Sequence, residues 1–167
     1  YDAPKGKAFV VDQRNVKLLG EKGVALKDPV TLSGQVIELD DLKLEAEVNI
    51  AENAQDIVIR DAQFEDKVSV DTASNVTFEN CLFRGGLFIK RSRDVVLRNC
   101  TLLTPTRGVA RNAPLWIDGD GVSVLNCVIY GERYGVVFSD KGDDDERLFK
   151  DNLWFGELGF CAIKPRR

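Results

Sequence analysis

The chain has 167 residues, of which 44% are hydrophobic and 30% are charged, and its formal net charge is −4. This composition excludes an intrinsically disordered chain, and the mild negative charge gives no footprint for nucleic-acid binding. No apolar run approaches the roughly 18 residues needed to cross a bilayer, so we expect no membrane span. Histidine is absent, which removes the commonest general base and the commonest metal ligand.

A short pattern recurs along the chain: an alternating apolar run, then an Asn or Asp, then a second alternating run. In chain order the copies are 36–44, 56–64, 75–83, 94–102, 121–129 and 147–155. The Asn or Asp recurs at intervals of 19 to 27 residues and forms the column Asp41, Asp61, Asn80, Asn99, Asn126 and Asn152. Self-similarity at this period indicates a solenoid, in which each repeat buries its apolar side chains only against its neighbours.

A second set of apolar triplets lies between these copies, at 9–11, 30–32, 48–50, 68–70, 87–89, 115–117, 136–138 and 160–162. Each repeat therefore contains three short strands, because period-2 alternation in such short runs leaves no room for a helix. Asn and Asp tolerate the left-handed backbone that the bend between two strands needs. Two outward columns alternate in charge and support this alignment. They are Asp40, Arg60, Glu79 and Arg98, and Asp71, Lys90 and Asp118.

Three of the four cysteines occupy one equivalent position, directly after the Asn of successive repeats. They are Cys81, Cys100 and Cys127. This spacing fits no metal-binding motif, and it is how a small buried residue stacks in a solenoid. We therefore expect three interior, reduced thiols. Since secretion would normally favour disulfides, the cysteines leave the cellular compartment open.

The segment Asn-Val-x-Phe-x-Asn-Cys-x-Phe at 75–83 resembles the repeats of the right-handed parallel β-helix superfamily, the pectate-lyase-like fold. The resemblance covers residues 9 to 164. It implies an all-β, single-stranded, right-handed parallel β-helix of about seven to eight rungs of 19–28 residues, with the Asn column internal. We expect residues 1–167 to form a single β-helix domain that is part of a longer protein. The resemblance also favours an extracytoplasmic or secreted location.

In pectate-lyase-like enzymes the substrate lies along the outer face of the third strand. The matching outward column here is Val10, Thr31, Asn49, Ser69, Phe88, Trp116, Val137 and Cys161. Phe88 and Trp116 would be neighbours, and an exposed aromatic pair bordered by charge is typical of a sugar platform or a protein contact. The candidate binding residues are therefore Phe88, Trp116, Arg107, Arg111 and Lys90. The alternative is that the enlarged turn 103–114 covers both rings.

The segment Leu115-Trp116-Ile117-Asp118 resembles the Trp-Ile-Asp-His segment of pectate lyases, with Gly119 in place of His. This resemblance implies a lyase site in which Asp118 and Asp120 bind Ca²⁺ and Arg107 or Arg111 abstracts the proton. The alternative for Asp118 is a structural charge ladder with Lys90. The acidic run 143–146 could supply oxygen ligands, but it lacks calcium-loop spacing, so a solvated turn is favoured.

The leading interpretation is a non-catalytic β-helix scaffold, or a carbohydrate- or protein-binding module, of a larger bacterial-type protein. It would need no cofactor, and its partner would be a polysaccharide or another protein domain. The alternative is a polysaccharide lyase or glycoside hydrolase of the pectate-lyase-like group acting on acidic polysaccharide, the one case that would use Ca²⁺. A third interpretation is a structural element that oligomerises through its open rung ends.

Overall fold

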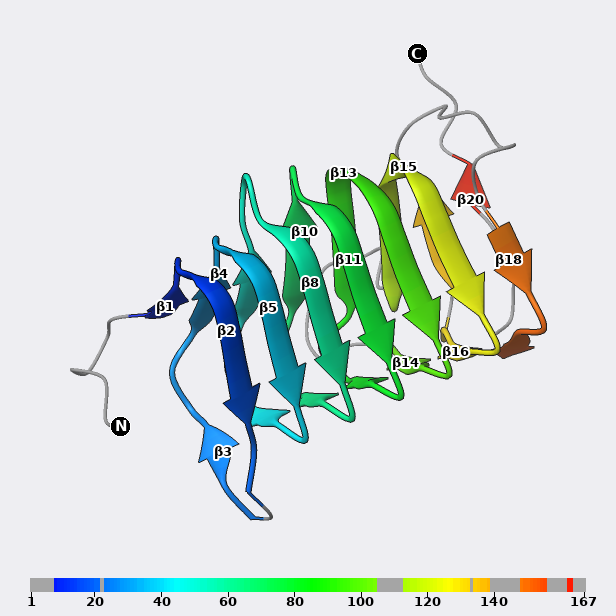
Figure 1. The fold of residues 1–167 in the computed structure, drawn as a ribbon. Coiled ribbons are helices and arrows are strands. Elements are labelled where there is room, and N and C mark those ends of the chain that lie inside the picture. The colour runs from blue at the N-terminus through cyan, green and yellow to red at the C-terminus, as the bar shows by residue number, and fades with distance from the viewer. Residues whose placement is uncertain are drawn as a thin grey trace.

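The computed structural model describes residues 8–21, 23–104, 113–132, 134–138, 148–155 and 162–163. In these ranges all regular elements are β-strands, and all strand pairs are parallel. No helix in the described ranges is long and apolar enough to cross a membrane. The chain is therefore an all-β parallel solenoid (Figure 1).

The strands form three faces. Face 1 contains β1 (Phe9–Val11), β4 (Val30–Leu32), β7 (Val48–Ile50), β10 (Val68–Asp71), the first part of β13 (Leu87–Arg98), the first part of β15 (Leu115–Leu125), β17 (Val136–Phe138) and β20 (Ala162–Ile163). Face 2 contains β2 (Arg14–Leu19), β5 (Gln35–Asp40), β8 (Gln55–Arg60), β11 (Ser74–Glu79), the second parts of β13 and β15, and β18 (Leu148–Lys150). Face 3 contains β3 (Ala25–Leu26), β6 (Lys43–Leu44), β9 (Gln63–Phe64), β12 (Leu82–Phe83), β14 (Thr101–Leu103), β16 (Val128–Tyr130) and β19 (Leu153–Phe155).

The coil is right-handed, because the face 2 strands run down the front of Figure 1 while the face 1 strands return behind them as the chain advances from N to C. It makes about six turns, slightly fewer than the seven to eight rungs expected. Strands β13 and β15 each pass around the corner between faces 1 and 2, and their pairing shifts register between Lys90 and Arg93.

The core is a stack of the inward residues of all three faces. Alternate residues point inward, so each strand buries its apolar set, as in Val48 and Ile50 or Ile57 and Ile59, all fully buried. Phe64 and Phe83 stack with their ring centroids 4.9 Å apart, and Phe78 meets Phe83 edge-on at 5.3 Å. The repeat pattern thus encodes the core directly.

The two charge columns confirm the alignment of the repeats. In strand register, Asp40 lies next to Arg60, Arg60 next to Glu79, and Glu79 next to Arg98. Asp71, Lys90 and Asp118 are neighbours in the same way. Arg60 forms ion pairs with Glu79 at 3.5 Å and with Glu38 at 3.8 Å. These pairs are solvent-exposed and contribute at most about 1 kcal/mol each.

The Asn and Asp column lies at the corner between faces 2 and 3. Asp41, Asp61, Asn80, Asn99 and Asn126 all take left-handed backbone with φ between 51° and 54°. Their side chains are exposed and not internal, which corrects the expectation drawn from the resemblance. The amide nitrogen of Asn126 donates to Oδ1 of Asn99 at 2.7 Å. The side chains that fill the inside of this corner belong to the next residue along the chain.

In the structure, the last member of this column is Asp151, one residue before the expected Asn152. Asp151, with φ 56°, takes the left-handed position, and Leu153 pairs with Val128. Asn152 therefore occupies the cysteine position of its rung. Its Oδ1 accepts from the backbone N–H of Cys127 at 2.8 Å, and its Nδ2 donates to the carbonyl of Val124 at 2.8 Å. Asn152 thus closes the cysteine column with hydrogen bonds.

Cys81, Cys100 and Cys127 are buried and reduced, as expected. Each thiol donates to the carbonyl two residues before it, at 3.3 Å. A hydrogen bond with the Cys100 thiol lowers the pKa of Cys81. The bond with Cys127 lowers the pKa of Cys100, but the bond with Cys81 and burial outweigh it and raise that pKa to about 12. The bond with Cys100, together with burial, raises the pKa of Cys127.

We predict that Cys100 stabilises the fold less as the pH rises. The unfolded thiol ionises near pH 9, whereas the native thiol stays protonated to about pH 12. Between these values the unfolded state loses a proton that the native state keeps, so the contribution of Cys100 is lost as the pH rises. Cys100→Ala should cost about 1 kcal/mol at pH 8, and urea denaturation should show the difference from wild type shrinking above pH 9. A difference that is constant up to pH 11 would contradict the prediction.

A second left-handed column, at the start of face 2, predicts a stabilising substitution. Asn15, Asp56, Asn75 and Asp94 take φ between 53° and 59°, but the same position in β5 is Val36, with φ 55°. A β-branched residue is strained there, so Val36→Asn should raise the free energy of unfolding by about 1 kcal/mol.

The matched control is Val58→Asn, which makes the same substitution at a half-buried outward position of face 2 that lacks a positive φ. There the change should destabilise, since Asn is a poor strand former. Urea denaturation of both variants tests the idea, and it is wrong if Val36→Asn also destabilises.

Candidate functional site

The outward column of face 1 is continuous across the rungs. Strand register joins Val10, Thr31, Asn49, Ser69, Phe88, Trp116 and Val137 in that order. The last expected member was misplaced by one residue, because Val137 pairs with Ala162 and not with Cys161. The column changes from polar to aromatic at Phe88. We call the segment Thr31, Asn49, Ser69, Phe88 and Trp116 the face 1 strip.

The structure brings Phe88 and Trp116 together. Their rings are nearly parallel, at 17°, with centroids 6.1 Å apart, and both side chains are half-buried. Lys67 Nζ lies 5.8 Å from the centroid of Phe88 and also pairs with Glu47 at 2.7 Å. Ring stacking and a cation over a ring face each contribute about 0.5–1.5 kcal/mol. Lys67 lies two residues before Ser69, on the rung that precedes Phe88. The sequence alone therefore did not identify it as a neighbour of Phe88.

The polar part of the strip contains an unusual hydroxyl. Ser69 is 6% exposed although it points outward, and its Oγ has no hydrogen-bond partner among the described residues. A buried hydroxyl without a partner costs roughly 1–3 kcal/mol. Thr31 and Asn49, on the two preceding rungs, are half-buried. Hydroxyl and amide groups therefore lie in line with the aromatic pair.

Lys90 and Asp118 follow the aromatic residues on the same two strands. Lys90 is exposed and lies between Asp71 and Asp118 in register. The close partner of Asp71 is Arg91, at 2.8 Å. Burial raises the pKa of Asp71, but hydrogen bonds from Arg91 and Thr72 outweigh it and hold that pKa below its usual value. Sequence reasoning missed Arg91 because the bend of the chain at the corner, with φ 47°, decides where it lies.

The residues of the expected lyase site are only partly brought together. Arg107 and Arg111 lie outside the described residues, as does the acidic run 143–146. Asp118 and Asp120 both border a groove at the corner between faces 1 and 2, with Arg91 and Arg93. Within the described ranges no group of three or more acidic, cysteine or histidine side chains could hold a metal ion. Among the described residues, no third side chain of these types joins Asp118 and Asp120 as a possible calcium ligand.

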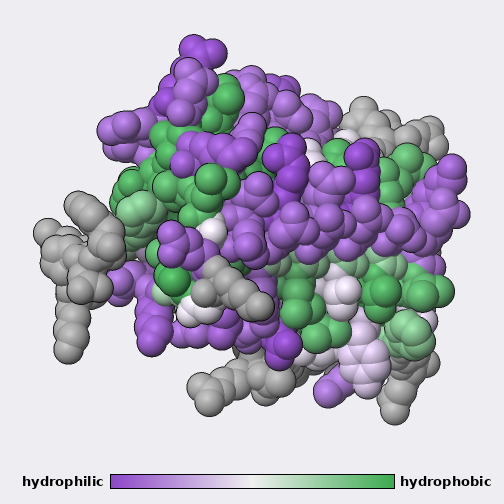
Figure 2. All heavy atoms as spheres, turned by 60° about the horizontal axis from the view of Figure 1, so that its bottom comes forward, coloured by the Kyte–Doolittle hydropathy of each residue, from purple (hydrophilic) through white to green (hydrophobic). Residues whose placement is uncertain are grey.

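Face 3 carries a different kind of surface. Its outward residues are polar in the early rungs, such as Lys43 and Gln63, and apolar in the late ones. Tyr130, Leu153 and Phe155 are 48%, 60% and 50% exposed. Figure 2 shows apolar side chains at this C-terminal end, at the right, and another apolar group at the left. Tyr130 and Phe155 lie with ring centroids 6.4 Å apart. The hydroxyl of Thr104 lies beside this surface and donates to the carbonyl of Tyr130 at 2.9 Å.

Comparison with known proteins assigns no family to the chain. No family model matches it, and no curated protein or solved structure is significantly similar to it. What can be inferred about function therefore depends on the face 1 strip and on the corner groove beside it.

Proposed function

We propose that the protein is a non-catalytic binding module of the pectate-lyase-like superfamily that holds a carbohydrate chain against face 1. The observation that carries the proposal is the half-buried, nearly parallel Phe88–Trp116 pair in line with the half-buried Thr31 and Asn49. Sugars present apolar C–H faces and hydroxyl edges, so they suit surfaces that combine aromatic rings with hydrogen-bonding groups.

Protein binding through the same strip is supported less well. Contacts between proteins centre on apolar or aromatic anchors that become fully desolvated, with the polar groups at the rim. In the face 1 strip, polar residues lead directly into the aromatic pair within one column, with Lys67 and Lys90 beside Phe88.

The lyase alternative needs groups beyond the strip. It requires Arg107 or Arg111 as the base and Ca²⁺ at Asp118 and Asp120, whereas binding requires only the strip itself. Both the binding module and the lyase would hold the polysaccharide on the same outer face of the coil. A lyase assay on polygalacturonate with added Ca²⁺ separates them, since cleavage would replace the binding-module proposal.

We predict that Trp116→Ala weakens binding to a soluble polysaccharide at least tenfold, about 1.4 kcal/mol. Because Trp116 is half-buried, the same change should lower the free energy of unfolding by less than the roughly 3–5 kcal/mol of a core aromatic. Calorimetric titration of wild type against a panel of neutral and acidic polysaccharides first identifies a ligand. Phe155→Ala, which removes an exposed aromatic from face 3, is the matched control and should bind normally.

Two results would refute the proposal. One is wild-type protein that binds no polysaccharide in the panel. The other is a Trp116→Ala variant that loses about 3 kcal/mol of stability and binds as wild type does, which would make the ring pair a packing element.

A further inference from the structure

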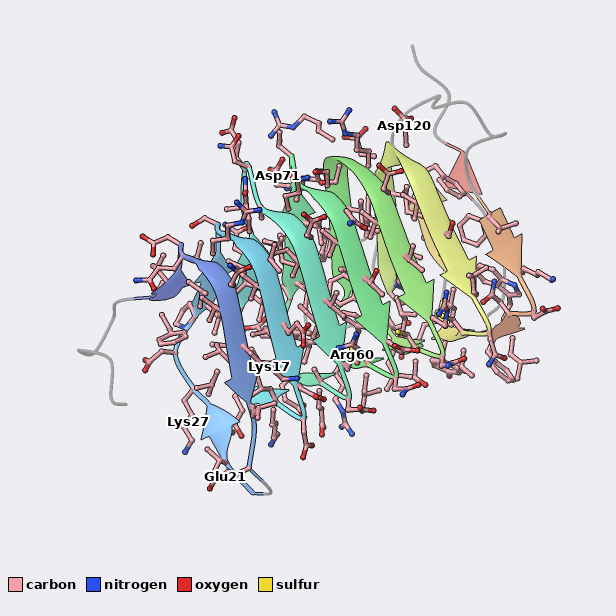
Figure 3. All side chains as sticks on the ribbon, in the orientation of Figure 1. Lys17, Glu21, Lys27, Arg60, Asp71 and Asp120 are labelled. Carbon is pink, nitrogen blue, oxygen red and sulfur yellow. The ribbon has the colours of Figure 1, made fainter. Side chains whose placement is uncertain are left out.

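The corner between faces 1 and 2 carries a groove of about 620 Å³. Its lining comes from successive rungs and comprises Gln35 and residues 53–55, 72–74, 91–93 and 118–120. At the usual spacing of parallel strands, four rung steps span roughly 19 Å. The groove therefore runs along the axis of the solenoid. Asp120, which lines the groove, lies near the top of Figure 3, away from Lys17 and Arg60 on the outer surface of face 2.

The floor of the groove is made of small buried residues, Ala54, Ala73, Ser92 and Gly119. A Cβ on Gly119 would lie 2.2 Å from the carbonyl oxygen of Ser92, so only glycine fits there. Ser92 Oγ accepts from the N–H of Ala73 at 3.1 Å and donates to the carbonyl of Lys90 at 2.9 Å. The floor is thus fixed by the backbone, and its hydroxyl is already used.

One wall is a ladder of polar side chains with open hydrogen-bonding capacity. Strand register joins Gln35, Gln55, Ser74, Arg93 and Asp120 in that order. None of these side chains forms a hydrogen bond or ion pair with another described residue. Arg93 and Asp120 are direct neighbours and still do not pair, in contrast to Arg60 on face 2, which pairs with two glutamates.

The opposite wall has strained backbone. Asn53, Thr72 and Arg91 take positive φ of 70°, 57° and 47°. For Thr and Arg such a conformation is strained, and strained backbone tends to occur at ligand sites. The ion pair of Arg91 with Asp71 holds this wall in place. Strain and unused polar groups therefore face each other across one groove.

We propose that the groove binds a neutral, hydroxyl-rich polysaccharide chain that lies parallel to the solenoid axis. Two arginines and two aspartates line the groove, so their charges cancel and neither a polyanion nor a polycation is favoured. Amide, carboxylate and guanidinium groups are planar and can each make two hydrogen bonds to adjacent hydroxyls. This inference rests on the proposed function, because Asp118 lines the groove and lies on β15, the strand that also carries Trp116.

The test uses Gln55→Ala and Arg93→Ala, singly and together, with Arg98→Ala as the matched control. Arg98 is an exposed arginine at the far end of the same strand, β13. The three side chains have no partner among the described residues, so the melting temperature should not change. Calorimetric titration should use a soluble β-glucan, a xylan and a mannan as neutral probes and polygalacturonate as the acidic one. We expect the double variant to bind the neutral ligand at least tenfold more weakly and Arg98→Ala to bind normally.

The outcomes separate this inference from the proposed function. If Trp116→Ala weakens binding but the double variant does not, the strip binds carbohydrate and the groove proposal is wrong. Wild-type protein that binds polygalacturonate alone also overturns the groove proposal and leaves the binding module standing. If the double variant loses binding and Trp116→Ala does not, the groove is the site and the strip is not. Wild-type protein that binds none of the four probes refutes both.

Discussion

Backbone hydrogen bonding between successive rungs is the constraint on which the rest of this molecule depends. In a parallel solenoid, the N–H and C=O groups of one rung bond to the rungs on either side, and few bonds form within a rung. Each strand must therefore match its neighbours residue for residue, as Val68, Ser69 and Val70 match Leu87, Phe88 and Ile89. A position in the repeat then fixes its neighbours in space, and every side chain becomes part of a column.

The corners make this register possible. The left-handed residue at Asn80 or Asn99 turns the chain between faces 2 and 3 within one residue, so the strands on both sides stay aligned. The residue after it fills the inside of the corner and is small in four rungs, at Ala62, Cys81, Cys100 and Cys127, whereas an earlier rung has Leu42 there. Stacking thiols in this confined space raises the pKa of Cys100 and Cys127 and keeps both uncharged.

The same stacking creates the candidate functional surfaces. One outward position per rung becomes a continuous strip, so a change from Ser69 to Phe88 and Trp116 turns a polar column into an aromatic one. At the corner beside this strip, small residues form the floor of the groove, and Gln55 and Arg93 belong to one of its walls. An elongated ligand that follows the axis would meet both features. We therefore propose a chain-like ligand and not a compact one, because the polar and aromatic groups repeat at the rung spacing.

The sequence by itself determined the solenoid, the inward and outward alternation and the charge columns, because period-2 patterns and the repeat length are local properties of the chain. It also identified the buried cysteines and the neighbouring pair Phe88 and Trp116. Tertiary structure alone decided that the Asn column faces outward, that Asp151 replaces Asn152 in it, and that Arg91 pairs with Asp71. These features depend on the backbone angle at single corner residues, which Asn and Asp permit but do not dictate. The groove was also hidden, since its walls join residues 35 to 120 across rungs, and no local pattern marks where small floor residues align.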